Sequence, residues 1–310
     1  MQWIRDHQPN PVRDQAYKTA LIITLAGNIF LAVGKGFVSF LTGSAALYSD
    51  TANSVADVIY SLAMVLGLWL AIQPPDLSHP QGHSRFEPIV GLVVAIMMAI
   101  AGYEAMRTSI GRFISGGSAI KLDLPMIILL VSAALKTGMF FVVKKLAETA
   151  QSPSLRVSAK DNLGDVLTSL AAFFGILGSS LIHPLLDPAA GVLVSLWIFR
   201  AAFEAGRENL KYLTGAGADE ALRQKIIKTA NGVEGVQQVH HMMSDYVGPK
   251  MIVDMHINLP GHTSLDEVHA VSDRVIDALQ ALPEVDRAYV HVEPFEEGND
   301  QPVVNSCDKV

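Results

Sequence analysis

Residues 45–72 read AALYSDTANSVADVIYSLAMVLGLWLAI, an apolar run with polar residues inside it. A helix needs about 20 apolar residues to cross the hydrocarbon core of a bilayer, and this run is long enough. Asn53 and Asp57 are four positions apart, so on a helix they share one face about 6 Å from each other. A carboxylate at membrane depth is costly unless it meets a cation or water, and Asp57 therefore indicates function.

A second apolar run, residues 157–183, repeats this arrangement. Its sequence VSAKDNLGDVLTSLAAFFGILGSSLIH places Asp161 and Asp165 four positions apart. Two such helices side by side would direct four oxygen ligands at one point, so we predict a divalent metal transport site formed by Asn53, Asp57, Asp161 and Asp165. The alternative is that these acids lie at helix ends or pair with basic residues.

The rest of the chain divides into an apolar part and a polar part. Half of the residues are hydrophobic and 17% are charged, but the long apolar runs all precede about residue 206. We therefore predict an all-α membrane domain of six spans at residues 16–206, preceded by a polar N-terminal segment, residues 1–15. The predicted spans are 16–41, 45–72, 87–112, 122–143, 157–183 and 186–206.

The distribution of basic residues predicts the orientation of these spans. An even number of spans places both termini on one side of the membrane, and basic residues concentrate on the cytoplasmic side. Up to the end of the fifth span, more basic residues lie on the side that holds the termini than on the opposite side. The terminal side has Arg5, Arg13, Lys18, Arg85, Lys144, Lys145, Arg156 and Lys160. The opposite side has Arg107, Arg112 and Lys121. Both termini are thus predicted to be cytoplasmic, in an inner (plasma) membrane.

Residues 213–295 have the pattern of a small α+β domain. A helix is expected at about 219–231, then two strands around Gly248 and Pro249, a second helix that begins with a Ser264 and Glu267 capping box, and a third strand ending in VHVEP. The order is αββαβ. The polar tail, residues 296–310, is expected to be disordered.

Two further groups of residues have metal-ligand chemistry. Asp76, His79 and His83 fall within one loop, PPDLSHPQGHSRFE, at a spacing that suits Zn²⁺ or a similar ion. Most of the ten histidines lie in the C-terminal part, among them His240, His256, His269 and His291. Loop histidines are also common without metal, and some of the C-terminal ones are expected to be ordinary surface or core residues.

Several ordered motifs together resemble the cation diffusion facilitator (cation efflux) family, in particular its bacterial YiiP-type members. The resemblance covers residues 15–295, from GSAALYSDTANSVADVIYS and the PPD…HPQGHSRFE loop through AKDNLGDVLTS and DPAAG to VHVEP. It implies a six-helix transporter with a C-terminal cytoplasmic ferredoxin-like domain, working as a homodimer that exchanges metal for protons. It also implies a loop metal site and a cytoplasmic binuclear site, which map onto two sets: Asp76, His79 and His83, and His240, His256, His269, His291 and Glu293.

The residue types at the transport site bear on the metal and on proton coupling. Zinc-transporting members of the family usually have a histidine there, often at the position of Asp161, whereas this site offers only oxygen ligands, which suit Mn²⁺ well. We therefore expect transport of Mn²⁺ or Fe²⁺, with Zn²⁺ as a further substrate. Crowded carboxylates hold protons when the site is empty, and metal entry must release them, so we expect proton antiport by competition.

Composition and motifs limit the other functions. The formal net charge of −7 argues against nucleic acid as a partner. The single cysteine, Cys307, excludes an internal disulfide. A metalloenzyme would need a general base, yet the sequence has no HExxH or GxSxG motif, and a membrane-anchored metal sensor would need fewer spans. No cofactor is expected beyond the metal ions themselves.

Overall fold

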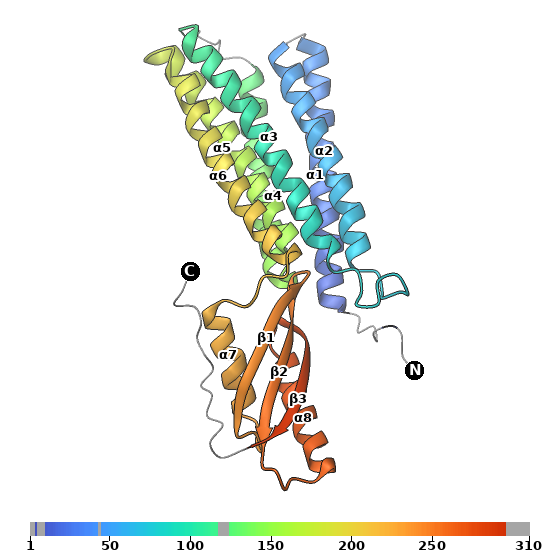
Figure 1. Ribbon diagram of the computed structural model, residues 1–310. Coiled ribbons are helices and arrows are strands. Elements are labelled where there is room, and N and C mark those ends of the chain that lie inside the picture. The colour runs from blue at the N-terminus through green and yellow to red at the C-terminus, as the bar shows by residue number, and fades with distance from the viewer. Residues whose placement is uncertain (1–3, 5–9, 43–44, 117–123, 296–310) are drawn as a thin grey trace. The chain divides into compact units, whose positions relative to one another are not determined.

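The computed structural model describes residues 4, 10–42, 45–116 and 124–295. The predicted disordered tail, 296–310, lies outside the described residues. The chain forms two compact units, Met1–Leu210 and Lys211–Val310, which are described separately below (Figure 1).

The first unit is a bundle of long helices (Figure 1). Each of six helices in the described ranges contains an apolar segment long enough to cross a membrane, which confirms the predicted number of spans. The helices are α1 (Pro11–Thr42), α2 (Ala45–Ala71), α3 (Phe86–Ile114), α4 (Leu124–Ala150), α5 (Pro153–Leu181) and α6 (Leu186–Leu213).

The connection between α4 and α5 is much shorter than the predicted spans suggest, because both helices extend beyond their apolar segments. Only Gln151 and Ser152 separate them, and Gln151 adopts a left-handed backbone conformation with φ of 51°. The Ser152 hydroxyl accepts a hydrogen bond from the Leu155 amide at 3.1 Å and so caps α5. Pro153 suits the first turn because its missing N–H is not needed there. This tight connection makes α4 and α5 neighbours.

A buried carboxylate joins three helices of the bundle. Glu87, in the first turn of α3, is only 2% exposed. The Tyr17 hydroxyl of α1 donates to Glu87 Oε2 at 2.6 Å. Ser152 and Ser154, at the start of α5, both donate from their hydroxyls to Glu87 Oε1. Since these donors come from segments far apart in the sequence, Glu87 fixes how α1, α3 and α5 meet.

We expect Glu87→Ala to destabilise the bundle, because the buried Tyr17 hydroxyl loses its acceptor and the hydroxyls of Ser152 and Ser154 keep only each other, at about 1–3 kcal/mol for an orphaned group. Glu104→Ala is the matched control on α3, where the carboxylate is exposed and pairs at 3.3 Å with Arg107. Thermal unfolding of the purified protein should show a lower midpoint for Glu87→Ala alone. Equal midpoints for both variants would contradict the role of Glu87.

The second unit confirms the predicted αββαβ order and ferredoxin-like class. Its elements are α7 (Glu220–Asn231), β1 (Gln238–Val247), β2 (Lys250–Leu259), α8 (Leu265–Gln280) and β3 (Val285–Pro294). Strand β2 is central, antiparallel to β1 and parallel to β3. Gly248 turns β1 into β2 with φ of 72°, a conformation that glycine adopts without strain.

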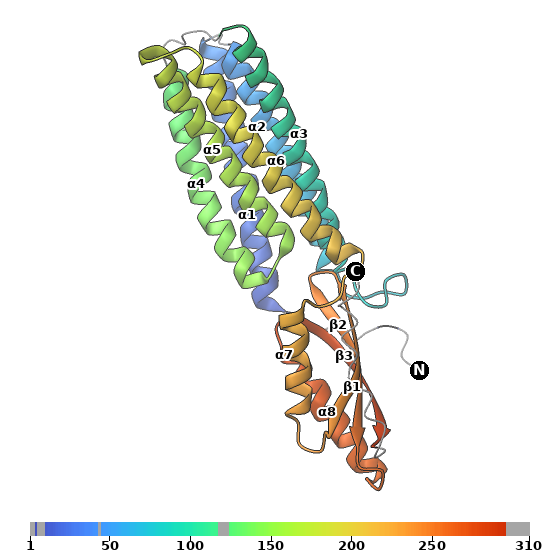
Figure 2. The same ribbon diagram turned by 60° about the vertical axis from the view of Figure 1, so that its left-hand side comes forward.

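Among residues 213–295, helices cover one face of this sheet and not the other. Helices α7 and α8 lie on the same side of the sheet (Figure 2). Val253, Met255 and Ile257 of β2 are fully buried in one core with residues of both helices. Because side chains alternate along a strand, Asp254, His256 and Asn258 point to the opposite side, which we call the helix-free face.

Candidate metal centres

The predicted transport site lies within the helical bundle. Asp57 is on α2, and Asp161 and Asp165 are on α5. Asp161 lies close enough to Asp57 and Asp165 to interact with both electrostatically. Asn53 belongs to α2, but its side chain is outside the described part, so its predicted role as a ligand stays a prediction.

A lysine outside the predicted set of site residues lies between two of these acids. The Lys136 Nζ of α4 is 3.0 Å from Asp57 Oδ2 and 2.6 Å from Asp165 Oδ2. The Lys136 side chain is 4% exposed, compared with 18% for Asp57 and 35% for Asp165. We refer to Asp57, Lys136, Asp161 and Asp165 as the membrane cluster. The sequence left open the alternative that these acids pair with a basic residue instead of binding metal. In the structure they do pair with one, and it comes from a third helix, α4.

Buried polar groups on α1 and α2 hold Asp57 in place. The Asn28 amide of α1 donates to Ser61 Oγ at 2.8 Å and to the Asp57 carbonyl oxygen at 3.3 Å. The Ser61 hydroxyl donates to the same carbonyl at 2.8 Å. Asn28 and Ser61 are 4% and 2% exposed. These bonds fix the backbone of α2 against α1 at the residue whose side chain contacts Lys136.

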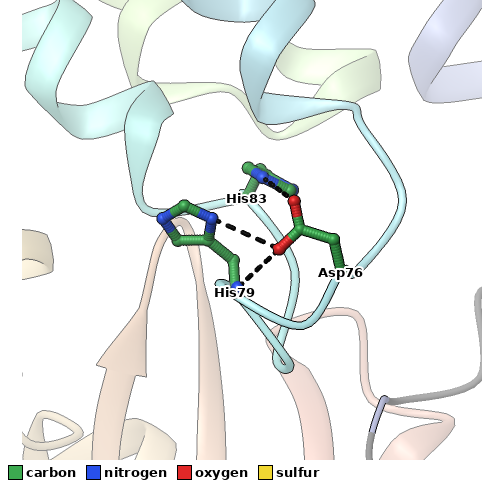
Figure 3. A group of neighbouring side chains, drawn as sticks. All are labelled: Asp76, His79 and His83. Carbon is green, nitrogen blue, oxygen red and sulfur yellow. Dashed lines mark hydrogen bonds and ion pairs between the residues drawn. The ribbon is translucent and has the colours of Figure 1, made fainter.

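The loop between α2 and α3 brings together all three of its predicted ligands. Asp76, His79 and His83 each offer a ligand atom, and these atoms all lie within 4.8 Å of one another. Asp76 Oδ1 is 3.5 Å from His79 Nδ1, and Asp76 Oδ2 is 3.5 Å from His83 Nε2 (Figure 3). We call this group the loop cluster. Two imidazoles and a carboxylate converging in this way suit Zn²⁺ or a similar ion.

Local backbone bonds shape the loop cluster. The His79 amide donates to Asp76 Oδ1 at 2.6 Å, and this bond lowers the pKa of the Asp76 carboxyl below its ordinary value. The carboxylate is thus ionised and ready to accept a cation at neutral pH. His83 is 9% exposed, and its Nδ1 is buried with no hydrogen-bond partner.

The helix-free face of the second unit carries the third group, which we call the C-terminal cluster: His240, His256 and Glu293. Glu293 Oε2 is 3.2 Å from His240 Nε2, and Glu293 Oε1 is 3.1 Å from His256 Nδ1. Their ligand atoms also lie within 4.8 Å of one another. Three strands contribute one residue each, so the sheet register positions the cluster.

An irregularity in β1 explains why His240 reaches this cluster. The pairing of β1 with β2 shifts between Val239 and His241, which adds one residue to β1 at this point. Such a bulge breaks the alternation of side chains. Both His240 and His241 therefore contact His256, with ring centroids 5.5 and 4.8 Å apart. His241 was not among the predicted ligands, and this bulge contains no glycine that would mark it in the sequence.

The remaining two predicted ligands of this domain differ in their surroundings. His291 pairs with His256 in the register, and its Nε2 is 3.6 Å from Glu293 Oε1, at the margin of the C-terminal cluster. His269 is on α8, 77% exposed, with its Nδ1 3.6 Å from Asp273. Because α8 covers the other side of the sheet, His269 does not join His240 and His256 within one chain.

We expect His256→Ala to remove one metal-binding event from the full-length protein, because His256 lies at the centre of the C-terminal cluster. His262→Ala is the control, since His262 follows a glycine in an exposed loop. Calorimetric titration with Zn²⁺ should show a lower stoichiometry for His256→Ala only. An unchanged stoichiometry in the folded variant would remove this cluster as a metal site.

Comparison with known proteins covers nearly the whole chain. Residues 21–214 match the cation efflux transmembrane domain, and residues 218–295 match the cation efflux protein cytoplasmic domain. The transporter MJ0449 of Methanocaldococcus jannaschii is 33% identical over 88% of this chain and 96% of its own length. The manganese efflux system protein MneS of Bacillus subtilis is 26% identical over 90% of this chain and 96% of its own length.

Magnetosome protein MamM is a further relative. The Paramagnetospirillum magneticum protein is 28% identical over 89% of this chain and 88% of its own length. Among solved structures, the copper form of the MamM CTD is 27% identical, with a TM-score of 0.25, and the match covers 26% of this chain and 89% of that chain.

Proposed function

The chain belongs to the cation efflux family of divalent metal transporters, and we propose that it is a metal/proton antiporter whose transport site is the membrane cluster together with Asn53. Metal export follows from the family, which consists of transporters and not enzymes. The metalloenzyme alternative is therefore set aside. Our proposal concerns three properties of this transporter: the residues through which the metal passes, the ion that is exchanged for it, and the metal that it prefers.

The observation that carries the proposal is the convergence of two helices on one buried positive charge. Asp57 of α2 and Asp165 of α5 both contact the Lys136 ammonium, at 3.0 and 2.6 Å. Carboxylates from separate helices thus meet at a position where a cation is stable. A divalent ion at the same position could take oxygen ligands from Asp57 and Asp165, with Asp161 next to them and Asn53 one turn before Asp57.

Proton exchange is the coupling that this chemistry favours. Carboxylates bind a cation only in their deprotonated form, so metal entry at these residues displaces any protons that they hold. Across an inner membrane the proton gradient points inward, and exchange would drive the metal out of the cytoplasm. The basic residues near the termini place both termini on the cytoplasmic side in this proposal.

The metal that we propose is Mn²⁺ or Fe²⁺, with Zn²⁺ also accepted. All four proposed ligands are oxygens, and carboxylate and carbonyl ligands suit Mn²⁺, whereas imidazole and thiolate favour Zn²⁺. A relative named as a manganese efflux system protein supports this choice. The loop and C-terminal clusters contain imidazoles, but they need not match the transported ion.

Homodimer formation is supported by the match of residues 218–295 to the cytoplasmic domain of the family. We propose that His240, His256, His269, His291 and Glu293 bind metal ions that have a regulatory or structural role in this domain. Filling these negative sites with cations would bring two copies of the domain together.

Removal of either central carboxylate should abolish transport. We expect Asp57→Ala and Asp165→Ala to reduce Mn²⁺ uptake into proteoliposomes to the level of empty vesicles, because each loses a ligand and leaves Lys136 poorly neutralised. Glu104→Ala removes an exposed carboxylate from α3 and should transport normally. Normal uptake by a correctly inserted Asp57→Ala or Asp165→Ala protein would refute the site, and a flux that ignores both pH and the pH gradient would refute proton exchange.

A histidine at position 161 should move the preference toward Zn²⁺. Asp161→His supplies the nitrogen ligand that Zn²⁺ favours and removes an oxygen ligand that suits Mn²⁺. Competition between Zn²⁺ and Mn²⁺ in the same proteoliposomes measures the ratio of the two rates. If the wild type carries Zn²⁺ and excludes Mn²⁺, or if the ratio is the same in both proteins, ligand type at this position does not set the selectivity.

A further inference from the structure

Lys136 lies deep within an apolar segment. It is the one charged residue between positions 127 and 143 of α4. Lys144 is eight residues away, which corresponds to about 12 Å along a helix. A lysine near a membrane surface extends its side chain to reach water, but the Lys136 side chain is 4% exposed. Its charge is thus neutralised inside the bundle and not by solvent.

The groups that act on Lys136 come from the helices packed around it. Asp57 on α2 and Asp165 on α5 contact the ammonium directly, and Asp161 attracts it from further away. Tyr60 on α2 lies within electrostatic reach of these acids and of Lys136. Lys35 on α1 also acts on Asp57, but more weakly than Lys136 does. Lys136 is therefore the cation that dominates this position.

The charges of the membrane cluster fit a divalent ion. Its three carboxylates exceed its single ammonium by two negative charges, which is the charge of one divalent cation. The two direct partners also remain partly exposed, at 18% for Asp57 and 35% for Asp165. Part of each side chain is therefore accessible beside the ion pair, although the Asp165 Oδ2 atom that contacts Lys136 is buried.

We propose that Lys136 is a built-in competitor for the transported metal, and this inference rests on the proposed function. In the metal-free carrier its ammonium holds the carboxylates of Asp57 and Asp165. The metal then binds as the ammonium withdraws from at least one of them. When the metal leaves, the ammonium returns to neutralise one negative charge and protons return to the other carboxylates, so no carboxylate is left bare at membrane depth, where unpaired charges are costly.

This arrangement has a consequence for affinity and for turnover. A positive charge next to the metal position opposes metal binding through Coulomb repulsion, which is strong where water is scarce. Lys136 therefore weakens metal affinity and assists release. Without it, the metal binds more tightly and leaves more slowly.

The test compares Lys136→Met with Lys136→Arg and with Lys145→Met, the same substitution at an exposed position of α4. Initial rates of Mn²⁺ uptake into proteoliposomes give KM and the maximal rate. We expect Lys136→Met to lower KM about tenfold or more and to reduce the maximal rate, since removing a close like charge is worth at least about a factor of ten in binding. Lys136→Arg keeps the charge and should retain a KM near that of the wild type, and Lys145→Met should change neither quantity.

A KM that is unchanged or raised in Lys136→Met would overturn the proposal, as would an equal decrease of KM in Lys136→Arg. If turnover of Lys136→Met is too slow to measure, calorimetric Mn²⁺ titration of the full-length protein provides the affinity. Subtracting the titration of an Asp57→Ala, Asp165→Ala double variant isolates the membrane cluster from the other metal sites. Should Lys136→Met fail to fold, Lys136→Gln removes the charge and keeps a hydrogen-bond donor.

Failure of this inference is distinguishable from failure of the proposed function. If the wild type carries no metal into vesicles, the proposed transport is wrong. If the wild type transports and Lys136→Met binds Mn²⁺ no more tightly, transport stands and the competitor role of Lys136 is wrong.

Discussion

Charges buried in the middle of a helical bundle must be neutralised by one another, and this constraint governs the membrane part of the protein. The Lys136 ammonium lies between the carboxylates of Asp57 and Asp165, so α2, α4 and α5 are tied together at one depth. Each of these residues alone would be unfavourable in an apolar environment. Together they form a position that accepts a cation, which is the physical requirement for a metal carrier.

Two features of the bundle help to position the membrane cluster. Asn28 and Ser61 direct their hydrogen bonds to the backbone carbonyl of Asp57 and so fix α2 against α1. The tight connection at Gln151 and Ser152 makes α4 and α5 neighbours, which brings Lys136 close to Asp165.

Much of the fold could be predicted from the sequence because long-range periodicity and hydropathy are strong signals. Six apolar runs predicted the six helices, and the alternation in VQQVHHMMSDYVG and KMIVDMHINL predicted β1 and β2. The loop cluster was also predictable, because Asp76, His79 and His83 are close in the sequence and a short loop keeps them close in space. Hydropathy reports the apolar part of a helix, however, and it missed the polar turns that extend α4 to Ala150.

The parts of the candidate sites that could not be predicted depend on contacts between elements. Lys136 has no acidic neighbour on α4, so nothing local indicates that Asp57 and Asp165 are its partners. A β-bulge between Val239 and His241 places both His240 and His241 beside His256, and no glycine in this stretch marks the bulge. His269 was grouped with His240 by resemblance, but it is on a helix that covers the opposite side of the sheet.

The proposed transport site is tested most directly by locating Mn²⁺ in the protein with anomalous X-ray scattering at the manganese edge. We predict a metal peak within ligand distance of the carboxylate oxygens of Asp57 and Asp165, with the Lys136 ammonium moved away from at least one of them. Manganese found only at the loop or C-terminal clusters, with Lys136 still between the two carboxylates at saturating metal, would contradict it.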